Sequence, residues 1–300
     1  NKAHLQYDSG EIEGPVTIQL VEGKRVLSET EVPDGETGRI KGTICDESLE
    51  KGLHTYQILV NNLESYKAEV TIDGKINGTL LFNETINETA IIEDTVSIPL
   101  GKTFDVNGNL VGEFVRVYGT MNLGDIVTDC DIRDYGTINF GQGVVLNGYV
   151  YFYVPVDING ISSGNASLFF YSDDSSTIQN CKGSLTIYVY GNTSVSVGSS
   201  EICTFALDQS ASVNITNSII SSIVALPEIT NLNVDGSTFL NMVLIAGGSP
   251  KFANCEFASD VILHHRTSAE FTGCVFGYSL TFDDAVYDDL LFDSLPFDVV

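Results

Sequence analysis

Basic residues, tryptophan, methionine and proline are all scarce in this sequence of 300 residues. Lysine and arginine number 14 against 40 aspartates and glutamates, which gives a formal charge of −26. So acidic a chain disfavours nucleic acid and anionic lipid as partners. No apolar run reaches the roughly 18 residues of a membrane-spanning helix, so we expect no direct membrane insertion.

The six cysteines include no C-x-x-C pair, which disfavours a zinc site. The chain opens at Asn1 without a signal peptide, and we interpret it as the mature or trimmed form of a secreted protein. Six N-x-S/T sequons fit an extracellular, glycosylated protein at the cell surface. These candidate glycosylation sites are Asn77, Asn83, Asn87, Asn165, Asn192 and Asn214.

A repeat of 17 to 20 residues runs from about residue 178 to residue 282. Its first column is apolar and consists of Ile178, Val197, Ile215, Val234, Phe252 and Phe271. A small residue follows three positions later, at Cys181, Ser200, Ser218, Ser237, Cys255 and Cys274. A third column then contains Gly183, Ile202, Ile220, Phe239, Phe257 and Phe276. The rows close on Ile187, Leu207, Ala225, Leu244, Leu263 and Phe282.

This pattern predicts a solenoid built from short strands. The residue before each small position is Asn, Ser or Gly, and Asn and Gly tolerate positive φ, so a left-handed corner is expected there. The small residue after the corner should point inward, where cysteine serves as a small apolar residue. Cys255 and Cys274 would lie on neighbouring coils, close enough for a disulfide that the sequence alone does not require.

Residues 1–73 have a different texture, with short alternating strands punctuated by Gly, Pro and Asp. Such a segment predicts an antiparallel sandwich. In its strand rhythm and in the stretch GLHTYQILV it resembles the small immunoglobulin-like repeats of bacterial and archaeal surface proteins. Because the segment is short for that fold, one strand is either missing or supplied by another chain.

Residues 74–300 resemble the right-handed parallel β-helix proteins of the pectate-lyase-like superfamily. The resemblance rests on the acidic first turn, the Pro-Leu-Gly corner at 99–101, the TFDVNG strand and the columns above. Within that superfamily the chain is similar to adhesin-like surface proteins of archaea and bacteria. The predicted fold is therefore all-β, with about ten coils between residues 90 and 285, preceded by an immunoglobulin-like sandwich.

Many β-helix proteins cleave polysaccharides, with a carboxylate pair or with a carboxylate-bound cation and a basic residue. Candidate carboxylates are Asp129, Asp131, Asp134, Asp173 and Asp174, and the residues that flank Cys130 are expected to face solvent. Basic residues beyond position 100 are few, and no Gly-His-Gly element is present. We interpret these carboxylates as a solvated acidic face and expect the protein not to be an enzyme.

Aromatic residues form the most informative surface feature. In LNGYVYFYVPV, alternation along the strand points Val150, Phe152 and Val154 inward, so the tyrosines between them face out. The next two coils repeat this arrangement, which predicts an aromatic patch for binding another chain or a glycan. Its members are Tyr149, Tyr151, Tyr153, Phe169, Tyr171, Tyr188 and Tyr190.

The C-terminal tail, from about residue 283 to residue 300, combines acidic and apolar residues. Asp283, Asp284, Asp288 and Asp289 are candidate calcium ligands, although a plain solvated tail is the simpler interpretation. The spacing of the apolar residues matches no coil. They either cap the last coil of the same chain or dock on a neighbouring subunit, where an extended peptide can complete an open sheet. These residues are Leu291, Phe292, Leu295 and Phe297.

Together these features predict a non-enzymatic structural or adhesive protein of the cell envelope. It would self-associate as an S-layer, sheath, filament or adhesin subunit, with no cofactor other than candidate calcium. The alternative is a protein that binds or degrades polysaccharide, as a lyase or a glycoside hydrolase. Convergent carboxylates in a groove beside the aromatic patch would favour this alternative.

Overall fold

The computed structural model describes residues 3–46, 52–72, 75–80, 83–207, 211–225, 231–264, 267–283 and 291–292. Every regular element within these ranges is a β-strand. The chain divides into two compact units, residues 1–75 and residues 76–300.

The first unit contains small antiparallel sheets, because its short alternating strands are separated by tight turns. Five apolar side chains form its core, namely Ile18, Leu20, Val32, Ile40 and Ile58. One pair of strands is β1 (Ala3–Asp8) with β6 (Lys41–Asp46), and a second is β2 (Ile12–Glu13) with β5 (Thr37–Gly38). A four-stranded sheet has the order β4 (Arg25–Val32), β3 (Val16–Glu22), β7 (Gly52–Val60) and β8 (Leu63–Ile72).

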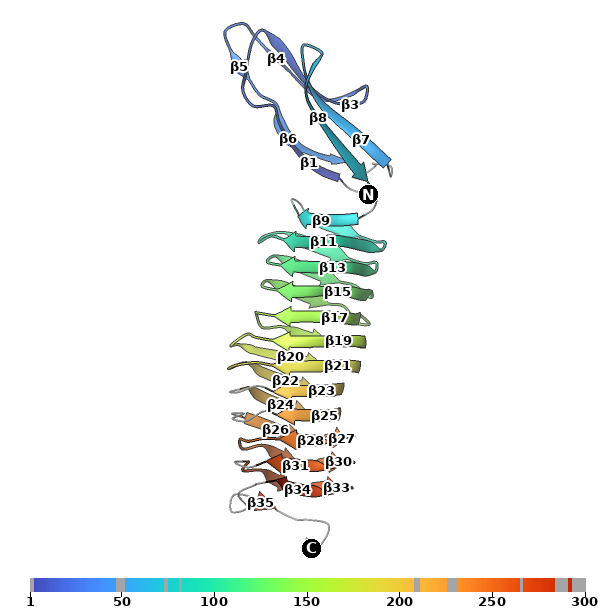
Figure 1. Cartoon of the computed structure of the whole chain (residues 1–300), viewed down its shortest axis with the longest axis vertical. Coiled ribbons are helices and arrows are strands. Elements are labelled where there is room, and N and C mark those ends of the chain that lie inside the picture. The colour runs from blue at the N-terminus through green and yellow to red at the C-terminus, as the bar shows by residue number, and fades with distance from the viewer. Residues whose placement is uncertain are drawn as a thin grey trace. The chain divides into compact units, whose positions relative to one another are not determined.

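The second unit is a parallel β-solenoid of about 11 turns, one more than the sequence predicted. Its strands stack coil upon coil into a long sheet of 15 strands, visible in Figure 1 as the column of arrows from β9 to β34. This long sheet contains β9 (Lys75–Thr79), β11 (Ala90–Ile98), β13 (Leu110–Val117), β15 (Val127–Asp134), β17 (Val145–Phe152), β19 (Ser162–Phe170), β21 (Lys182–Val189), β23 (Glu201–Leu207), β25 (Ile219–Ala225), β27 (Thr238–Phe239), β28 (Val243–Ile245), β30 (Glu256–Phe257), β31 (Val261–His264), β33 (Val275–Phe276) and β34 (Leu280–Asp283).

Two further parallel sheets complete the coils. The four-stranded sheet consists of β10 (Glu84–Ile86), β12 (Thr103–Val106), β14 (Thr120–Leu123) and β16 (Thr137–Phe140). The eight-stranded sheet consists of β18 (Asp157–Asn159), β20 (Ser175–Gln179), β22 (Ser194–Gly198), β24 (Ser212–Thr216), β26 (Asn231–Asp235), β29 (Lys251–Ala253), β32 (Glu270–Thr272) and β35 (Leu291–Phe292).

The first predicted column is confirmed. Val197, Ile215, Val234, Phe252 and Phe271 are paired in register from coil to coil, and each is at most 3% exposed. They belong to one apolar core that runs through the solenoid, because alternate residues of every strand point inward.

The left-handed corners are also confirmed. Asn180, Ser199, Asn217 and Asn254 have φ between 49° and 55°, and Gly236 and Gly273 have φ of 61° and 62°. Side chains with a Cβ are disfavoured in this region, and Asn and Gly are the least disfavoured residues. The repeat therefore keeps Asn or Gly at most corners and turns the chain sharply between the two sheets.

The small column is held by hydrogen bonds as well as by size. Within it, the Ser218 hydroxyl accepts the N–H of Ser200 (3.2 Å) and donates to the carbonyl of Thr216 (2.8 Å). Ser200 and Ser237 make the equivalent bonds one coil away on either side. Each buried hydroxyl thus joins two coils, which explains why serine suits this buried position.

Three assignments in the predicted columns are wrong. Val189, and not Ile187, is in register with Leu207, because Ile187 pairs with Phe205. Ile245, and not Leu244, is in register with Ala225, and Leu244 is only half-buried. Gly183 is exposed, whereas Ile202 is buried, and the pairing of β21 with β23 begins only at Thr186 and Thr204. One extra residue causes the slip at Leu244, since Ile220 pairs with Phe239 but Ile223 pairs with Val243. Ile187 lies two residues before Val189, the residue that pairs with Leu207.

Candidate functional site: an aromatic face on the long sheet

The outward side of the long sheet carries two rows of side chains that we call the central row and the tyrosine row. In the central row, one residue from each coil follows the next in strand register. It reads Ser97, Arg116, Arg133, Tyr151, Phe169, Tyr188, Ala206, Val224, Leu244, Ile262 and Thr281. The tyrosine row, two positions further along each coil, consists of Tyr118, Tyr135, Tyr153, Tyr171 and Tyr190.

The tyrosine row is a continuous stack of five rings. Successive ring centroids lie 5.1, 4.5, 5.2 and 4.8 Å apart, with interplanar angles between 5° and 11°. These separations are close to the spacing of about 4.8 Å between neighbouring strands, so the backbone repeat sets the stack. Burial among neighbouring rings raises the pKa of Tyr153 and of Tyr171 above the ordinary value of a phenol.

The central row forms a second stack beside the first. Tyr151 and Phe169 lie 4.7 Å apart, and Phe169 and Tyr188 lie 4.6 Å apart at 3°. The guanidinium of Arg133 lies 4.9 Å from the Phe114 ring and 5.5 Å from the Tyr151 ring, in the range of cation–π attraction. The stack is thus closed at one end by a positive charge.

Stacking decides which part of each ring meets solvent. Within both stacks the ring faces are covered by the rings of the neighbouring coils, so edges and hydroxyl groups point outward. Sugars bind aromatic residues mainly through the ring face. The face therefore presents a row of ring edges and phenol hydroxyls, and an exposed ring face occurs only where a stack ends.

All seven residues of the predicted patch lie on this side of the long sheet. Six of them belong to the two rows, and Tyr149 lies beside them, with its ring centroid 6.1 Å from Phe169. Their role in binding stays a prediction. Val154, expected inward, is half-buried because β17 already ends at Phe152.

Sequence reasoning missed several members of this face. Tyr118 and Tyr135 stand in the equivalent stretches V-Y-G-T and D-Y-G-T, so a search for tyrosine at steps of 17 to 19 residues would have found them. Ala206, Val224, Leu244 and Ile262 were also missed, and Leu244 had been assigned to the inward phase in place of Ile245. These four residues are half-buried and extend the central row beyond the aromatic stack.

Asp134 corrects the prediction of a uniformly solvated acidic face. Its side chain is only 1% exposed and lies in the inward column between Val117 and Phe152. One carboxylate oxygen accepts the N–H of Gly136 at 3.0 Å, whereas the other has no hydrogen-bond partner. Burial raises the pKa of Asp134 to about 6, because the charged form is poorly solvated there.

The other candidate carboxylates do not converge. Asp129, Asp173 and Asp174 are exposed, and Asp131 is half-buried with one oxygen accepting the N–H of Tyr149 at 3.1 Å. In the described part of the chain, no group of three or more His, Cys, Asp or Glu residues is placed to hold a metal ion.

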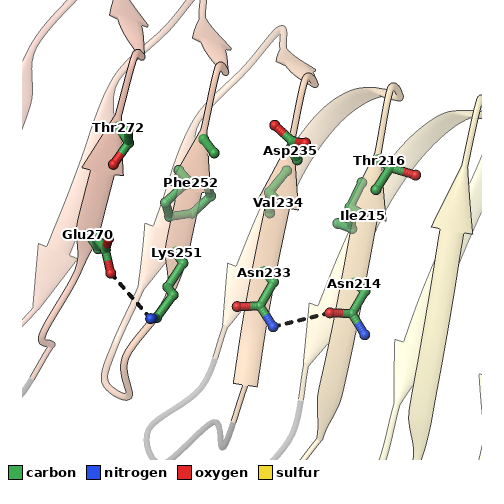
Figure 2. A pocket seen from close by; sticks show the side chains of 11 residues that line it. Asn214, Ile215, Thr216, Asn233, Val234, Asp235, Lys251, Phe252, Glu270 and Thr272 are labelled. Atoms are coloured by element: carbon green, nitrogen blue, oxygen red, sulfur yellow. Dashed lines mark hydrogen bonds and ion pairs between the residues drawn. The ribbon is translucent and has the colours of Figure 1, made fainter. Parts of the chain in front are cut away.

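A shallow groove of about 320 Å³ lies on the eight-stranded sheet, away from the aromatic face (Figure 2). One side carries Asn214, Asn233, Lys251 and Glu270, and the other side carries Thr216, Asp235 and Thr272. The side-chain amide of Asn233 donates a hydrogen bond to the side-chain oxygen Oδ1 of Asn214 at 3.1 Å. The Lys251 ammonium nitrogen lies 3.3 Å from a carboxylate oxygen of Glu270.

The two carboxylates of this groove have separate partners, Lys251 for Glu270 and the Asn254 amide for Asp235. They stand two strands apart and at different positions along those strands, so their backbones are about 12 Å apart. Neither property fits the acid and base of a glycosidase, whose carboxyl groups face one scissile bond.

The remaining predicted sites have mixed outcomes. All six sequon asparagines are exposed. Leu291 and Phe292 form β35, which pairs with β32 of the same chain, so these two residues take the place of a further coil and the prediction that they match none is wrong. Leu295, Phe297, Asp284, Asp288 and Asp289 lie outside the described residues, as does the side chain of Asp283.

Five of the six cysteines, Cys130, Cys181, Cys203, Cys255 and Cys274, are free thiols, and the side chain of Cys45 lies outside the described part of the structure. Cys255 and Cys274 occupy the small column on neighbouring coils. A hydrogen bond between the two thiols lowers the pKa of Cys274 to about 7 and raises that of Cys255. Burial raises the pKa of Cys130 to about 12, so that thiol is unreactive.

These features define the class as an all-β protein with a parallel β-solenoid and small N-terminal antiparallel sheets. Neither protein-family models, nor curated protein sequences, nor solved structures give a significant match to the chain. Within the ranges that the structure covers, there is no helix of the length and apolar character that crossing a membrane requires.

Proposed function

We propose that this chain is a non-enzymatic structural or adhesive protein of the cell envelope that acts through the aromatic face. One observation carries the proposal. A chain with a formal charge of −26 keeps a continuous apolar stripe, from Tyr151 to Ile262, on the outside of its longest sheet. Exposed apolar stripes of this length are usually contact surfaces in soluble proteins.

The finer classification belongs to the same proposal. We interpret residues 74–300 as a right-handed β-helix and residues 1–73 as an immunoglobulin-like sandwich, an arrangement typical of adhesin-like surface proteins. The six exposed sequons support an extracellular location, since glycosylation requires accessible asparagines. S-layer, sheath, filament and adhesin subunits all fit this description.

A double substitution, Tyr171→Ser with Tyr188→Ser, tests the proposal. It removes a ring from each stack while the inward core stays intact, so the protein should fold but lose assembly or surface adhesion. A matched control is Asn214→Ser with Asn233→Ser, which removes two outward side chains from the eight-stranded sheet. Unchanged assembly and unchanged adhesion in the tyrosine variant would contradict the proposal.

The second candidate function is polysaccharide binding, and the groove in Figure 2 favours it. The groove offers amide, hydroxyl, ammonium and carboxylate groups in two parallel rows, which suit the hydroxyl groups of an extended glycan. Isothermal titration with neutral and acidic oligosaccharides tests this candidate. Binding that is lost in the Asn214 and Asn233 double variant, but kept in the tyrosine variant, would favour it over the first.

A further inference from the structure

The apolar part of the central row has Ala206 at its centre and three larger residues on each side. Three aromatic residues precede it, Tyr151, Phe169 and Tyr188, each one coil apart. Three aliphatic residues follow it at the same spacing, Val224, Leu244 and Ile262. The smallest side chain therefore lies at the centre, with large flat rings on one side and compact branched chains on the other.

The charge of the central row contrasts with the acidic character of the chain as a whole. All positions of the central row are described, and they contain two arginines, Arg116 and Arg133, and no carboxylate. Because the whole chain carries a formal charge of −26, two copies repel each other over most of their surfaces. Two copies that face each other across the central row therefore bring no carboxylates of this row into opposition.

We infer that a second copy of this chain docks on the aromatic face, with the two solenoids antiparallel and related by a two-fold axis that passes Ala206. This inference rests on the proposed function and specifies its partner. With the axis parallel to the strands, each central row covers the central row of the other copy in reverse order.

This arrangement opposes unlike side chains. Tyr188 lies across from Val224 of the second copy, Phe169 from Leu244, and Tyr151 from Ile262. Arg133 then lies across from the hydroxyl of Thr281. Rings thus meet aliphatic groups throughout, which allows the two surfaces to interlock as interface cores do.

The parallel two-fold arrangement is disfavoured by the same residues. It places each coil opposite the identical coil, so Arg116 and Arg133 face their own copies, and every ring edge meets another ring edge. Like charges in direct opposition across an interface cost several kcal/mol. The face therefore selects the antiparallel pairing.

The available area fits a specific interface. In the antiparallel pairing nine positions of the central row face each other, from Arg133 to Thr281, and coils repeat about every 4.8 Å, so the paired length is about 43 Å. Three outward rows make it about 13 Å wide, or about 560 Å² for each copy. The total of about 1,100 Å² exceeds the roughly 1,000 Å² expected of a specific protein–protein interface.

Ala206→Asp tests the inference most directly, because it places two carboxylates against each other at the axis. Sedimentation velocity should show a dimer for the wild type and a monomer for this variant, at both 0.15 and 0.5 M salt (about 8 and 4 Å of screening length). Ser196→Asp, which makes the same charge change on β22 of the eight-stranded sheet, should remain dimeric.

A side-chain exchange tests the register. Tyr188→Val and Val224→Tyr should each weaken the dimer by about tenfold, because each destroys both symmetry-related contacts between a ring and an aliphatic group at this position. The combined exchange restores both matches and should return the affinity to within about threefold of the wild type. Additive weakening in the combined variant would overturn the proposed register.

Cross-linking tests the orientation. Thr186 and Ser222 occupy the neighbouring outward row, one coil to either side of Thr204. In a Cys203→Ser background, a short bis-maleimide should join Thr186→Cys chains to Ser222→Cys chains in a mixture, and neither variant to itself. Linking of each variant to itself would overturn the antiparallel arrangement.

The outcomes separate this inference from the proposed function. A wild-type chain that stays monomeric, yet binds glycans or cell surfaces through Tyr171 and Tyr188, would overturn docking between copies and leave the contact role of the face standing. A monomeric chain in which the tyrosine variant changes nothing would contradict both.

Discussion

The long sheet and the eight-stranded sheet of the solenoid are both parallel, yet their outward faces differ in chemical character. On the eight-stranded sheet, the outward rows consist of amides, hydroxyls and charged groups such as Asn214, Asn233 and Lys251. On the long sheet, the central row is aromatic and then aliphatic. The inward residues of both sheets are mostly apolar. Inward positions thus determine the coil, while outward positions are free to specify what the surface binds.

The largest expected effect comes from placing an aspartate at an inward position of a strand, compared with the neighbouring outward position. Val234→Asp places a carboxylate between Ile215 and Phe252 in the core, which should cost several kcal/mol and unfold the solenoid. Asn233→Asp, one residue earlier on the outward side, should leave the free energy of unfolding within about 1 kcal/mol of wild type. Urea denaturation followed by circular dichroism checks both, and equal effects would contradict the inward assignment.

Asp134 is an exception to the rule that inward positions are apolar, and its stability effect should depend on pH. Its folded pKa of about 6 exceeds the unfolded value of 3.8, so the cost of burying the charge is present above pH 6 and disappears as the pH falls toward 4. At pH 7 Asp134→Asn should therefore be more stable than wild type by on the order of 3 kcal/mol.

At pH 4 the difference between the two proteins should nearly vanish, because the protonated carboxyl is neutral like the amide. Denaturation curves of wild type and Asp134→Asn at both pH values provide the measurement. A difference in unfolding free energy that does not change with pH would show that Asp134 is not buried in its charged form.

The small column predicts a moderate effect. Ser218→Ala removes the hydroxyl that accepts the Ser200 N–H and donates to the Thr216 carbonyl, and should destabilise the solenoid by about 1–3 kcal/mol. Ser218→Cys keeps a polar sulfur of the kind that this column already uses at Cys255, so its loss should be smaller. If both substitutions have the same effect, the column depends on side-chain size alone.

The last comparison is between the two outward faces and includes the smallest expected effect, that of Asn233→Ala. Tyr171→Ala removes stacking on both Tyr153 and Tyr190 and should cost about 1–3 kcal/mol. Asn233→Ala removes one exposed amide hydrogen bond and should cost less than about 1 kcal/mol. The melting temperatures of the two variants show which substitution destabilises the protein more. Equal decreases in melting temperature would mean that ring stacking contributes no more to stability than one exposed hydrogen bond.

How far the sequence could predict the site depended on register. The rings from Tyr149 to Tyr190 were found because period-2 alternation places them outward whatever their neighbours are. Leu244 was misplaced because a one-residue insertion before Val243 shifts the phase, and a slip of one residue moves a strand's side chains to the other face. Without the strand pairing, the aliphatic half of the central row could not be recognised.

By itself, the sequence determined the solenoid, its left-handed corners and its buried columns, because these features depend on local φ preferences and on alternation along single strands. The tertiary structure decided which outward residues of different coils become neighbours. It joined Tyr118 and Tyr135 to the predicted patch and buried Asp134 in the core. The physical reason is that coil-to-coil register is set by hydrogen bonds between strands 17 to 20 residues apart, so each bulge or insertion changes which side chains meet.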